Sequence, residues 1–239
     1  MIQASDNETF KLIFHNYNKH LIRRNFHGIY LTKNSNPLPA KGSIVLINHS
    51  SWWDPLILFY LNQSIWKKNA LAMMSEDGLA RFPFFKKIGA FSINPNSPRS
   101  IVESLDYAAA QLRAGKHIFL FPQGNEFPLD KRPLQFFSGA GHLKYQVPTA
   151  PVIPISFYHG LFHHSKPEWF IHIGAPVSGA PSWNRKKWTK QMEDYHTQEL
   201  NYLREDIIQE NDNFVPLLSG YQDISTHWER LKRKAGILK

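Results

Sequence analysis

Between two apolar runs of this chain lies the stretch Asn48-His49-Ser50-Ser51-Trp52-Trp53-Asp54-Pro55. The preceding run, residues 43–47, is short and rich in β-branched residues, which predicts a buried strand. Asp54 and Pro55 are typical of a helix start, with Asp at the N-cap and Pro at the first helical position. The apolar residues 56–61 continue that helix. The stretch therefore predicts a strand that leads through a short connection into a helix.

His49 and Asp54 of this stretch form a candidate catalytic pair. A short strand-to-helix connection can fold the imidazole back onto the carboxylate. A carboxylate on one ring nitrogen fixes the tautomer and leaves the other nitrogen able to take a proton from a hydroxyl. The alternative is that Asp54 only caps the helix and that His49 is an ordinary loop histidine. The chain has twelve histidines, so the pair by itself does not decide between the two.

Outward from this stretch, strand-like runs alternate with helical patterns. Strands are expected at residues 43–47, 70–74, 89–93, 117–121, 152–157 and 169–173, and helices at 9–26, 56–63, 97–113 and from about 183. The alternation predicts an α/β fold with a mixed, mostly parallel β-sheet flanked by helices. Pro154 falls inside one expected strand, which predicts an edge or bulged position.

The chain shows no repeat and no linker that would divide it, so we expect a single domain over residues 1–239. Within it we expect an amphipathic helical N-terminal segment (1–40), an α/β core (41–180) and a helical C-terminal part (181–239). A chain of 239 residues is long enough to bury a sizeable core.

Composition narrows the chemistry. The sequence has no cysteine, which excludes disulfides, zinc–thiolate sites and a cysteine nucleophile. Its formal net charge of +9 favours an anionic partner, such as nucleic acid, an anionic membrane surface or a phosphorylated ligand.

The N-terminal region indicates a membrane surface rather than a membrane span. No run approaches the roughly 18 apolar residues of a spanning helix, and the polar start lacks the layout of a signal peptide. Residues 9–26 combine aromatic and basic side chains, and positions 10, 13, 14, 17 and 21 share one helical face. Such a helix suits interfacial membrane binding; alternatively, it packs on the core of its own domain. We expect a cytoplasmic protein, peripherally associated with the cytoplasmic face of the membrane.

Four sequence blocks, taken in order, resemble the glycerolipid acyltransferase family, which includes the 1-acylglycerol-3-phosphate acyltransferases. The blocks are Asn48, His49 and Asp54; Gly89–Ile93 with Arg99; Phe121–Glu126; and Val147–Pro154. Phe137–Ala140 also resembles a shorter family motif. The likeness covers roughly residues 40–160.

The resemblance implies an O-acyltransferase that moves a fatty acyl group from acyl-CoA or acyl carrier protein to a hydroxyl of a lipid-type acceptor. In this interpretation His49 is the general base and Asp54 orients it, without a cofactor beyond the thioester co-substrate. No enzyme nucleophile is needed, and Ser50 and Ser51 are interpreted as turn residues. Trp52 and Trp53 either line the substrate site or acyl tunnel or simply pack in the core.

Two departures from the family pattern concern the acceptor. Gln123 stands where the family has Glu, Glu126 stands where it has Arg, and Asn94 and Pro95 follow the second motif's strand in place of its Arg. Family cations at these places are thought to hold a phosphate, which a carboxylate at 126 would repel. We therefore expect a neutral acceptor, a glycosylated lipid or glycosylated carotenoid; the alternative is 1-acylglycerol 3-phosphate. The candidate substrate-binding residues are Gln123, Gly124, Asn125, Glu126, Arg99, Lys131, Arg132, Trp52 and Trp53.

Other classes of function are less well supported by the residues. Histidines 159, 163, 164 and 172 lack a carboxylate at metal-site spacing, so we expect surface histidines and no metal. Nucleic-acid binding lacks a motif, and the cations are scattered over the N-terminus, 185–190 and 229–239. A non-catalytic lipid-binding protein of the same fold would not require His49 and Asp54, which are both present.

Overall fold

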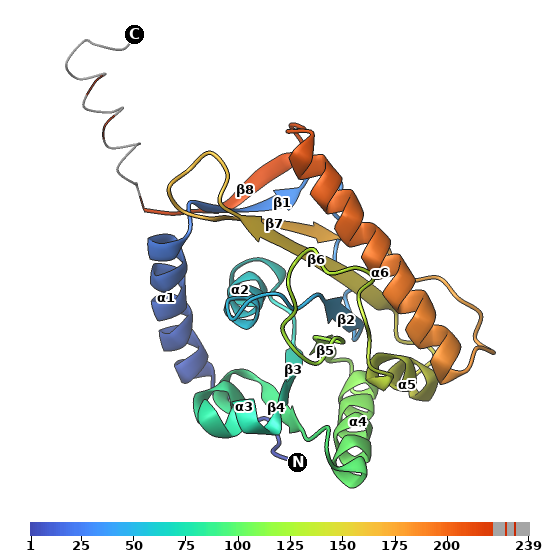
Figure 1. Ribbon diagram of the computed structural model, residues 1–239. Helices are drawn as coiled ribbons and strands as arrows, with labels where there is room; N and C mark the ends of the chain where they lie inside the picture. Colours follow the sequence, from blue (N-terminus) through green and yellow to red (C-terminus); the bar gives the residue numbers. More distant parts are fainter. Residues whose placement is uncertain (222–227, 229–231, 233–239) are drawn as a thin grey trace.

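One mixed β-sheet runs through the computed structural model, which describes residues 1–221 together with Trp228 and Lys232 (Figure 1). The described strands are β1 (Gly28–Thr32), β2 (Ile44–Ile47), β3 (Ala70–Ser75), β4 (Ala90–Ile93), β5 (His117–Leu120), β6 (Val152–Gly160), β7 (Glu168–Ile173) and β8 (Phe214–Ser219). Their order in the sheet is β4-β3-β5-β2-β6-β7-β1-β8. Neighbours from β4 to β6 are parallel, β7 is antiparallel to β6, and β8 is antiparallel to β1. The predicted single α/β domain with a mostly parallel mixed sheet is confirmed.

Helices cover both faces of this sheet (Figure 1). They are α1 (Glu8–Asn25), α2 (Asp54–Leu61) with a π-helical turn (Asn62–Trp66), α3 (Glu76–Arg81) with a 3-10 turn (Pro83–Ile88), α4 (Pro98–Arg113), α5 (Gly139–Gln146) and α6 (Arg185–Ile208). Helices α1 and α2 pack on one face, and α4, α5 and α6 pack on the other.

Strand β2 shows why the sequence before the His49 loop is a continuous apolar run. Val45 and Ile47 point into the core under α1 and α2, whereas Ile44 and Leu46 point into the core under α4, α5 and α6. All four side chains are fully buried. A parallel strand that is covered on both faces has no solvent side, and alternation with polar residues is therefore absent.

Helix α1 combines the two alternatives that its sequence left open. Ile22 and Asn18 are buried, and Phe14 packs against Phe59 of α2, so the helix is part of the domain. Ile13 and Tyr17 belong to the predicted apolar face, yet their side chains are 64% and 59% exposed. The face that positions 10, 13, 14, 17 and 21 share is thus partly buried and partly exposed, and the buried Asn18 and Ile22 mark the side that faces the domain. No described helix is both long and apolar enough to cross a membrane.

Two strands and the place of one proline differ from what the sequence predicts. Strands β1 and β8 lie in segments expected to be helical, and they pair with each other across nearly the whole chain (Gly28 with Ser219). The edge position predicted from Pro154 is wrong, because β6 lies between β2 and β7. The Pro154 carbonyl accepts the Gly174 N–H just beyond the last β6–β7 pair, which is Ile155 with Ile173. Because the β6–β7 pairing has already ended there, it does not need the N–H that proline lacks. The end of the expected C-terminal helical part, with the cations of 229–239, lies outside the described residues apart from Trp228 and Lys232.

Close packing of α5 on α6 generates the first prediction. A Cβ on Gly141 would lie 2.5 Å from the Arg185 carbonyl oxygen and would also meet Thr189, whereas a Cβ on Gly139 would meet only Leu105, at 3.7 Å. We expect Gly141→Ala to lower the free energy of unfolding in urea by about 1–3 kcal/mol through overpacking. The matched Gly139→Ala should be neutral or stabilising by up to about 1 kcal/mol, because alanine favours the helix. Equal effects of the two variants would contradict this account of the α5–α6 contact.

Candidate active site

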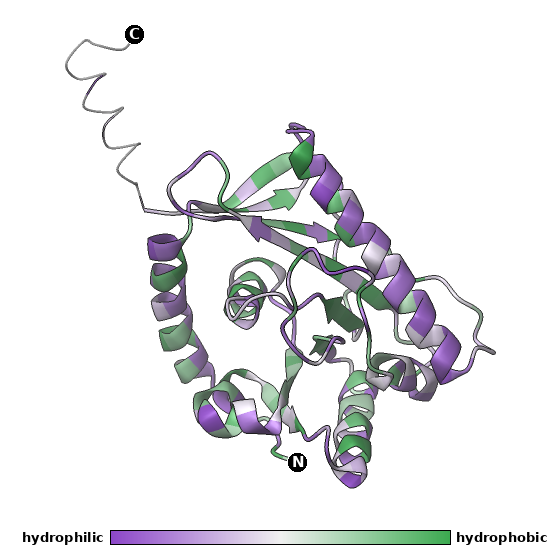
Figure 2. Cartoon of the chain, in the orientation of Figure 1, coloured by the Kyte–Doolittle hydropathy of each residue, from purple (hydrophilic) through white to green (hydrophobic). Residues whose placement is uncertain are grey.

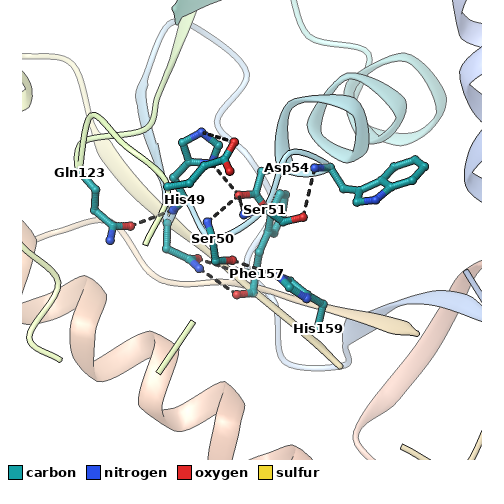
Figure 3. A network of polar contacts seen from close by, with 10 residues as sticks. His49, Ser50, Ser51, Asp54, Gln123, Phe157 and His159 are labelled. Carbon is teal, nitrogen blue, oxygen red and sulfur yellow. Dashed lines mark hydrogen bonds and ion pairs between the residues drawn. The ribbon is translucent and has the colours of Figure 1, made fainter. Parts of the chain in front are cut away.

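The loop between β2 and α2 brings the His49 and Asp54 side chains together (Figure 3). The distance from His49 Nδ1 to Asp54 Oδ2 is 2.7 Å. The same carboxylate oxygen accepts the backbone N–H groups of Ser50 and Ser51 at 2.7 and 2.9 Å. Asp54 is fully buried and is the first residue of α2, so the helix N-terminus adds to the stabilisation of its charge. It is not the N-cap that the sequence predicted, since its carboxylate binds the preceding loop instead of the first helical turn.

This arrangement fixes the chemistry of the His49 ring. A carboxylate can only accept, so Nδ1 carries a hydrogen, and in the neutral ring Nε2 then holds the lone pair. The ring stacks on Phe121 at a centroid distance of 4.4 Å, and its side chain is 17% exposed. Nε2 lies 3.9 Å from the carboxylate oxygen Oε1 of Glu126, which is 52% exposed. One ring nitrogen is thus bonded to buried Asp54 and the other lies next to a solvent-facing carboxylate, an arrangement that suits a general base.

Residues 123–127, which follow β5, hold the backbone of His49 from both sides. The Gln123 amide oxygen accepts the His49 N–H at 2.8 Å, and the Phe127 N–H donates to the His49 carbonyl at 3.0 Å. The Gln123 side chain is buried, so its oxygen supports the base and is not open to an acceptor. Gly124 has a φ of +74°, and a Cβ there would lie 2.5 Å from the Phe137 ring, so this turn requires glycine.

Asn48 attaches the loop to the neighbouring strand. Its Nδ2 donates to the Phe157 carbonyl at 2.9 Å and its Oδ1 accepts the Phe157 N–H at 2.7 Å. The side-chain amide thus imitates a strand partner and extends the β2–β6 pairing, which ends at Ile47 with Ile155. The sequence alone does not indicate this role of Asn48, because its partner is 109 positions away.

His159 belongs to this site and was missed. Its Nε2 lies 3.1 Å from Ser50 Oγ, and its ring stacks on Trp169 at 4.3 Å. Burial lowers the pKa of His159, outweighing the nearby Asp54 charge, which raises it. A neutral imidazole therefore supports the outer side of the catalytic loop. The expectation of a surface histidine is wrong for His159, because β6 extends to Gly160, past the strand expected at 152–157, and so includes this residue.

The two tryptophans of the loop have different environments. Trp53 packs edge-on against Phe26 at 4.9 Å and belongs to the core, which favours the packing interpretation for this residue. Trp52 is 52% exposed and meets Trp53 edge-on at 5.5 Å. Trp52 is thus the one of the two whose surface is open to a bound molecule.

The cations expected near the acceptor have partners of their own. Arg99 is 91% exposed and pairs with Glu103 on α4, which follows β4, separated from β2 by two strands. Lys131 lies over the Phe127 ring, and Arg132 binds the Leu129 and Lys131 carbonyls and Asn201. Among the described residues, the ion pairs of His49 are with the carboxylates of Asp54 and Glu126. Asn125 is exposed beside Glu126.

The four histidines considered for metal binding do not come together. The expected surface position is wrong for His172, which is buried between Thr32 and Glu199. His163 is exposed and reaches Glu210. His164 lies near Glu168 instead.

Comparisons with known proteins add to this geometry. Residues 28–158 match the family model described as Acyltransferase. A Mycoplasma pneumoniae protein described as a probable 1-acyl-sn-glycerol-3-phosphate acyltransferase is 26% identical over 133 residues, 54% of this chain. The aligned part is 49% of that protein, so the chain spans about half the length of the curated relative it matches. The crystal structure of a 1-acyl-sn-glycerophosphate acyltransferase from Thermotoga maritima has the same fold: its TM-score is 0.56 at 16% identity, covering 80% of this chain and 79% of that one.

The Asn48 contact leads to a prediction about stability. Asn48→Ala leaves the buried N–H and carbonyl of Phe157 without these partners, so we expect the free energy of unfolding to fall by about 1–3 kcal/mol in urea denaturation. Asn16→Ala is the control, because the Asn16 amide bonds Leu12 at the exposed surface of α1, where water can replace it. A loss at Asn48 no larger than at Asn16 would show that the amide does not anchor the loop.

Proposed function

The chain belongs to the acyltransferase family, and on this premise we propose that it transfers a fatty acyl group from an acyl thioester to a hydroxyl of a lipid-type acceptor. The observation that carries the proposal is the His49 ring, whose Nδ1 is bonded to buried Asp54 and whose Nε2 is free of any bond to that carboxylate. Such a ring is prepared to remove a proton from a hydroxyl.

In the proposed mechanism the acceptor alcohol attacks the thioester directly. The hydroxyl oxygen forms a bond to the thioester carbonyl carbon while His49 Nε2 takes the hydroxyl proton. Asp54 stabilises the imidazolium that forms, without itself being protonated. The tetrahedral intermediate then breaks its carbon–sulfur bond, and the proton on Nε2 passes to the departing thiolate. The products are the acyl ester and the free thiol of coenzyme A or of the acyl carrier protein.

Ser50 and Ser51 remain assigned to the loop in this mechanism. Their backbone N–H groups are used by Asp54, the Ser51 hydroxyl accepts the Trp53 N–H, and the Ser50 hydroxyl contacts His159. These bonds are those of a turn that presents His49. The intact base and its buried carboxylate also favour an enzyme over a non-catalytic lipid- or nucleic-acid-binding protein.

For the acceptor we propose a neutral, hydroxyl-rich group, as in a glycosylated lipid or a glycosylated carotenoid. Glu126 supports this choice, because its carboxylate lies 3.9 Å from His49 Nε2, where the reacting hydroxyl must bind. A carboxylate accepts bonds from neighbouring hydroxyls and repels a phosphate. Arg99 bonds to Glu103 and Arg132 bonds to Asn201, which also favours an acceptor without a phosphate. The alternative acceptor, 1-acylglycerol 3-phosphate, is favoured by the name of the Mycoplasma relative.

A peripheral place on the cytoplasmic membrane face is part of the same proposal. Each candidate acceptor, whether a glycosylated lipid, a glycosylated carotenoid or 1-acylglycerol 3-phosphate, is an amphipathic or apolar molecule that resides in a bilayer. Leu12, Ile13 and Tyr17 are exposed on α1, each by about three-fifths, and Lys19 and Arg24 are exposed on the same helix. Figure 2 shows apolar and polar residues mixed along this helix. Exposed apolar side chains among cations suit an anionic interface.

The role of His49 predicts a large loss of turnover on its removal. His49→Ala should lower kcat by about 10²–10⁴-fold, the typical contribution of a general base. Release of free thiol from acyl-CoA in the presence of acceptor measures the rate, and thermal melting checks that the fold is intact. His20→Ala, at an exposed histidine on α1, is the matched control. A His49→Ala protein that keeps most of the wild-type rate would exclude this mechanism.

The acceptor proposal predicts which tube of a substrate panel becomes labelled. The donor is acyl-CoA or acyl-loaded carrier protein with a radiolabelled acyl chain. The label should move to a glucosyl lipid or glycosylated carotenoid and not to lysophosphatidic acid or glycerol 3-phosphate. Glu126→Arg should shift the preference towards lysophosphatidic acid, because a cation would then stand beside the base. Glu205→Arg, at an exposed carboxylate of α6, should leave the preference unchanged. Labelling of lysophosphatidic acid by the unmodified protein would establish the alternative acceptor.

A further inference from the structure

Two imidazoles and a buried carboxylate meet where strands β1 and β7 begin. Ligand atoms of His27, His164 and Glu168 all lie within 4.8 Å of one another. We propose that these three residues form a binding site for a first-row transition-metal dication such as Zn²⁺. The proposal is independent of the acyltransferase reaction.

Two of the three ligands are held by the sheet. Gly28 pairs in register with Glu168, so His27 directly precedes the residue opposite the carboxylate. The His27 N–H donates to the Pro167 carbonyl at 2.8 Å, and its carbonyl accepts the Gly220 N–H at 2.7 Å. His164 comes from the connection between β6 and β7 and reaches Glu168 at 3.9 Å. The backbone thus brings together side chains that are distant in the sequence.

Burial makes the Glu168 carboxylate depend on compensation. Glu168 is 8% exposed, and a carboxylate removed from water is costly unless it is paired or binds a metal. The Tyr30 hydroxyl donates a hydrogen bond to this carboxylate. A hydrogen-bonded partner of this kind orients a carboxylate ligand towards a metal.

The two imidazole rings lie face to face. The rings of His27 and His164 are parallel, 5° apart in plane, with centroids separated by 3.3 Å. Imidazole nitrogens and a carboxylate oxygen are the donors that the three side chains offer to a metal. Because the rings are parallel, at least one must rotate for both lone pairs to meet the same ion.

The donor set indicates the kind of metal. Nitrogen ligands with one carboxylate suit Zn²⁺ and its transition-metal neighbours, while Mg²⁺ and Ca²⁺ prefer oxygen alone. Three protein ligands leave room for water in a tetrahedral site. A bound ion would join the β6–β7 connection to the start of β1.

The experiment uses the full chain, treated with a chelator and then titrated with Zn²⁺ against a chromophoric competitor. We expect one equivalent to bind and the melting temperature to rise with Zn²⁺ concentration. Cobalt(II) in place of zinc should give visible absorption of a tetrahedral site. Tyr30→Phe should weaken binding by about 10–100-fold, as is typical when a ligand loses its hydrogen-bond partner.

His164→Ala and Glu168→Gln should weaken binding more than Tyr30→Phe does. The matched control is His163→Ala, whose exposed imidazole is adjacent in sequence and reaches Glu210 instead; its affinity should equal that of the unmodified chain. His164 lies in a surface connection, so its variant tests the proposal even where Glu168→Gln fails to fold. Failure to bind one equivalent, or equal affinity in His164→Ala and the control, would overturn the proposal.

Discussion

The candidate site depends on the burial of one carboxylate, that of Asp54. A buried charge is unfavourable unless donors surround it, and here three donors converge on a single oxygen: the His49 ring and two successive backbone N–H groups. These three hydrogen bonds form only when the loop turns tightly around the start of α2. The same bonds that make the charge tolerable therefore fix the tautomer and direction of the imidazole, so the folding of this loop and the preparation of the base are one event.

Three parallel strands hold this loop in place, because their carboxyl ends lie next to one another in the sheet. Strand β2 leads into His49, the segment after β5 bonds both sides of the His49 backbone, and β6 pairs with Asn48 through Phe157. Because these strands are buried on both faces, the edge cannot shift without disturbing two cores. A rigid sheet edge is the kind of support that keeps catalytic groups within the narrow tolerance that reactions require.

The carboxylates paired with His49 are negative, whereas the chain as a whole is positively charged. The protein carries a formal net charge of +9, yet in the described part of the chain His49 pairs with two carboxylates, those of Asp54 and Glu126. The overall positive charge suits steering of an anionic thioester carrier or attraction to an anionic surface, both of which act over long range. The local negative charge acts at contact distance, on the group that must approach Nε2.

The sequence by itself determined the fold class and the pairing of His49 with Asp54, because both are local: strand and helix signals lie within a few residues, and the pair spans one short loop. Tertiary structure alone decided the roles of Asn48, Gln123 and His159, whose partners lie 74 to 109 positions away. It also decided that β1 and β8 are strands, since short segments with weak local preference become strands only when a distant partner supplies the hydrogen bonds. Strand and helix signals and the His49–Asp54 pair depend on residues close in the sequence, whereas burial and long-range pairing exist only after the chain has folded.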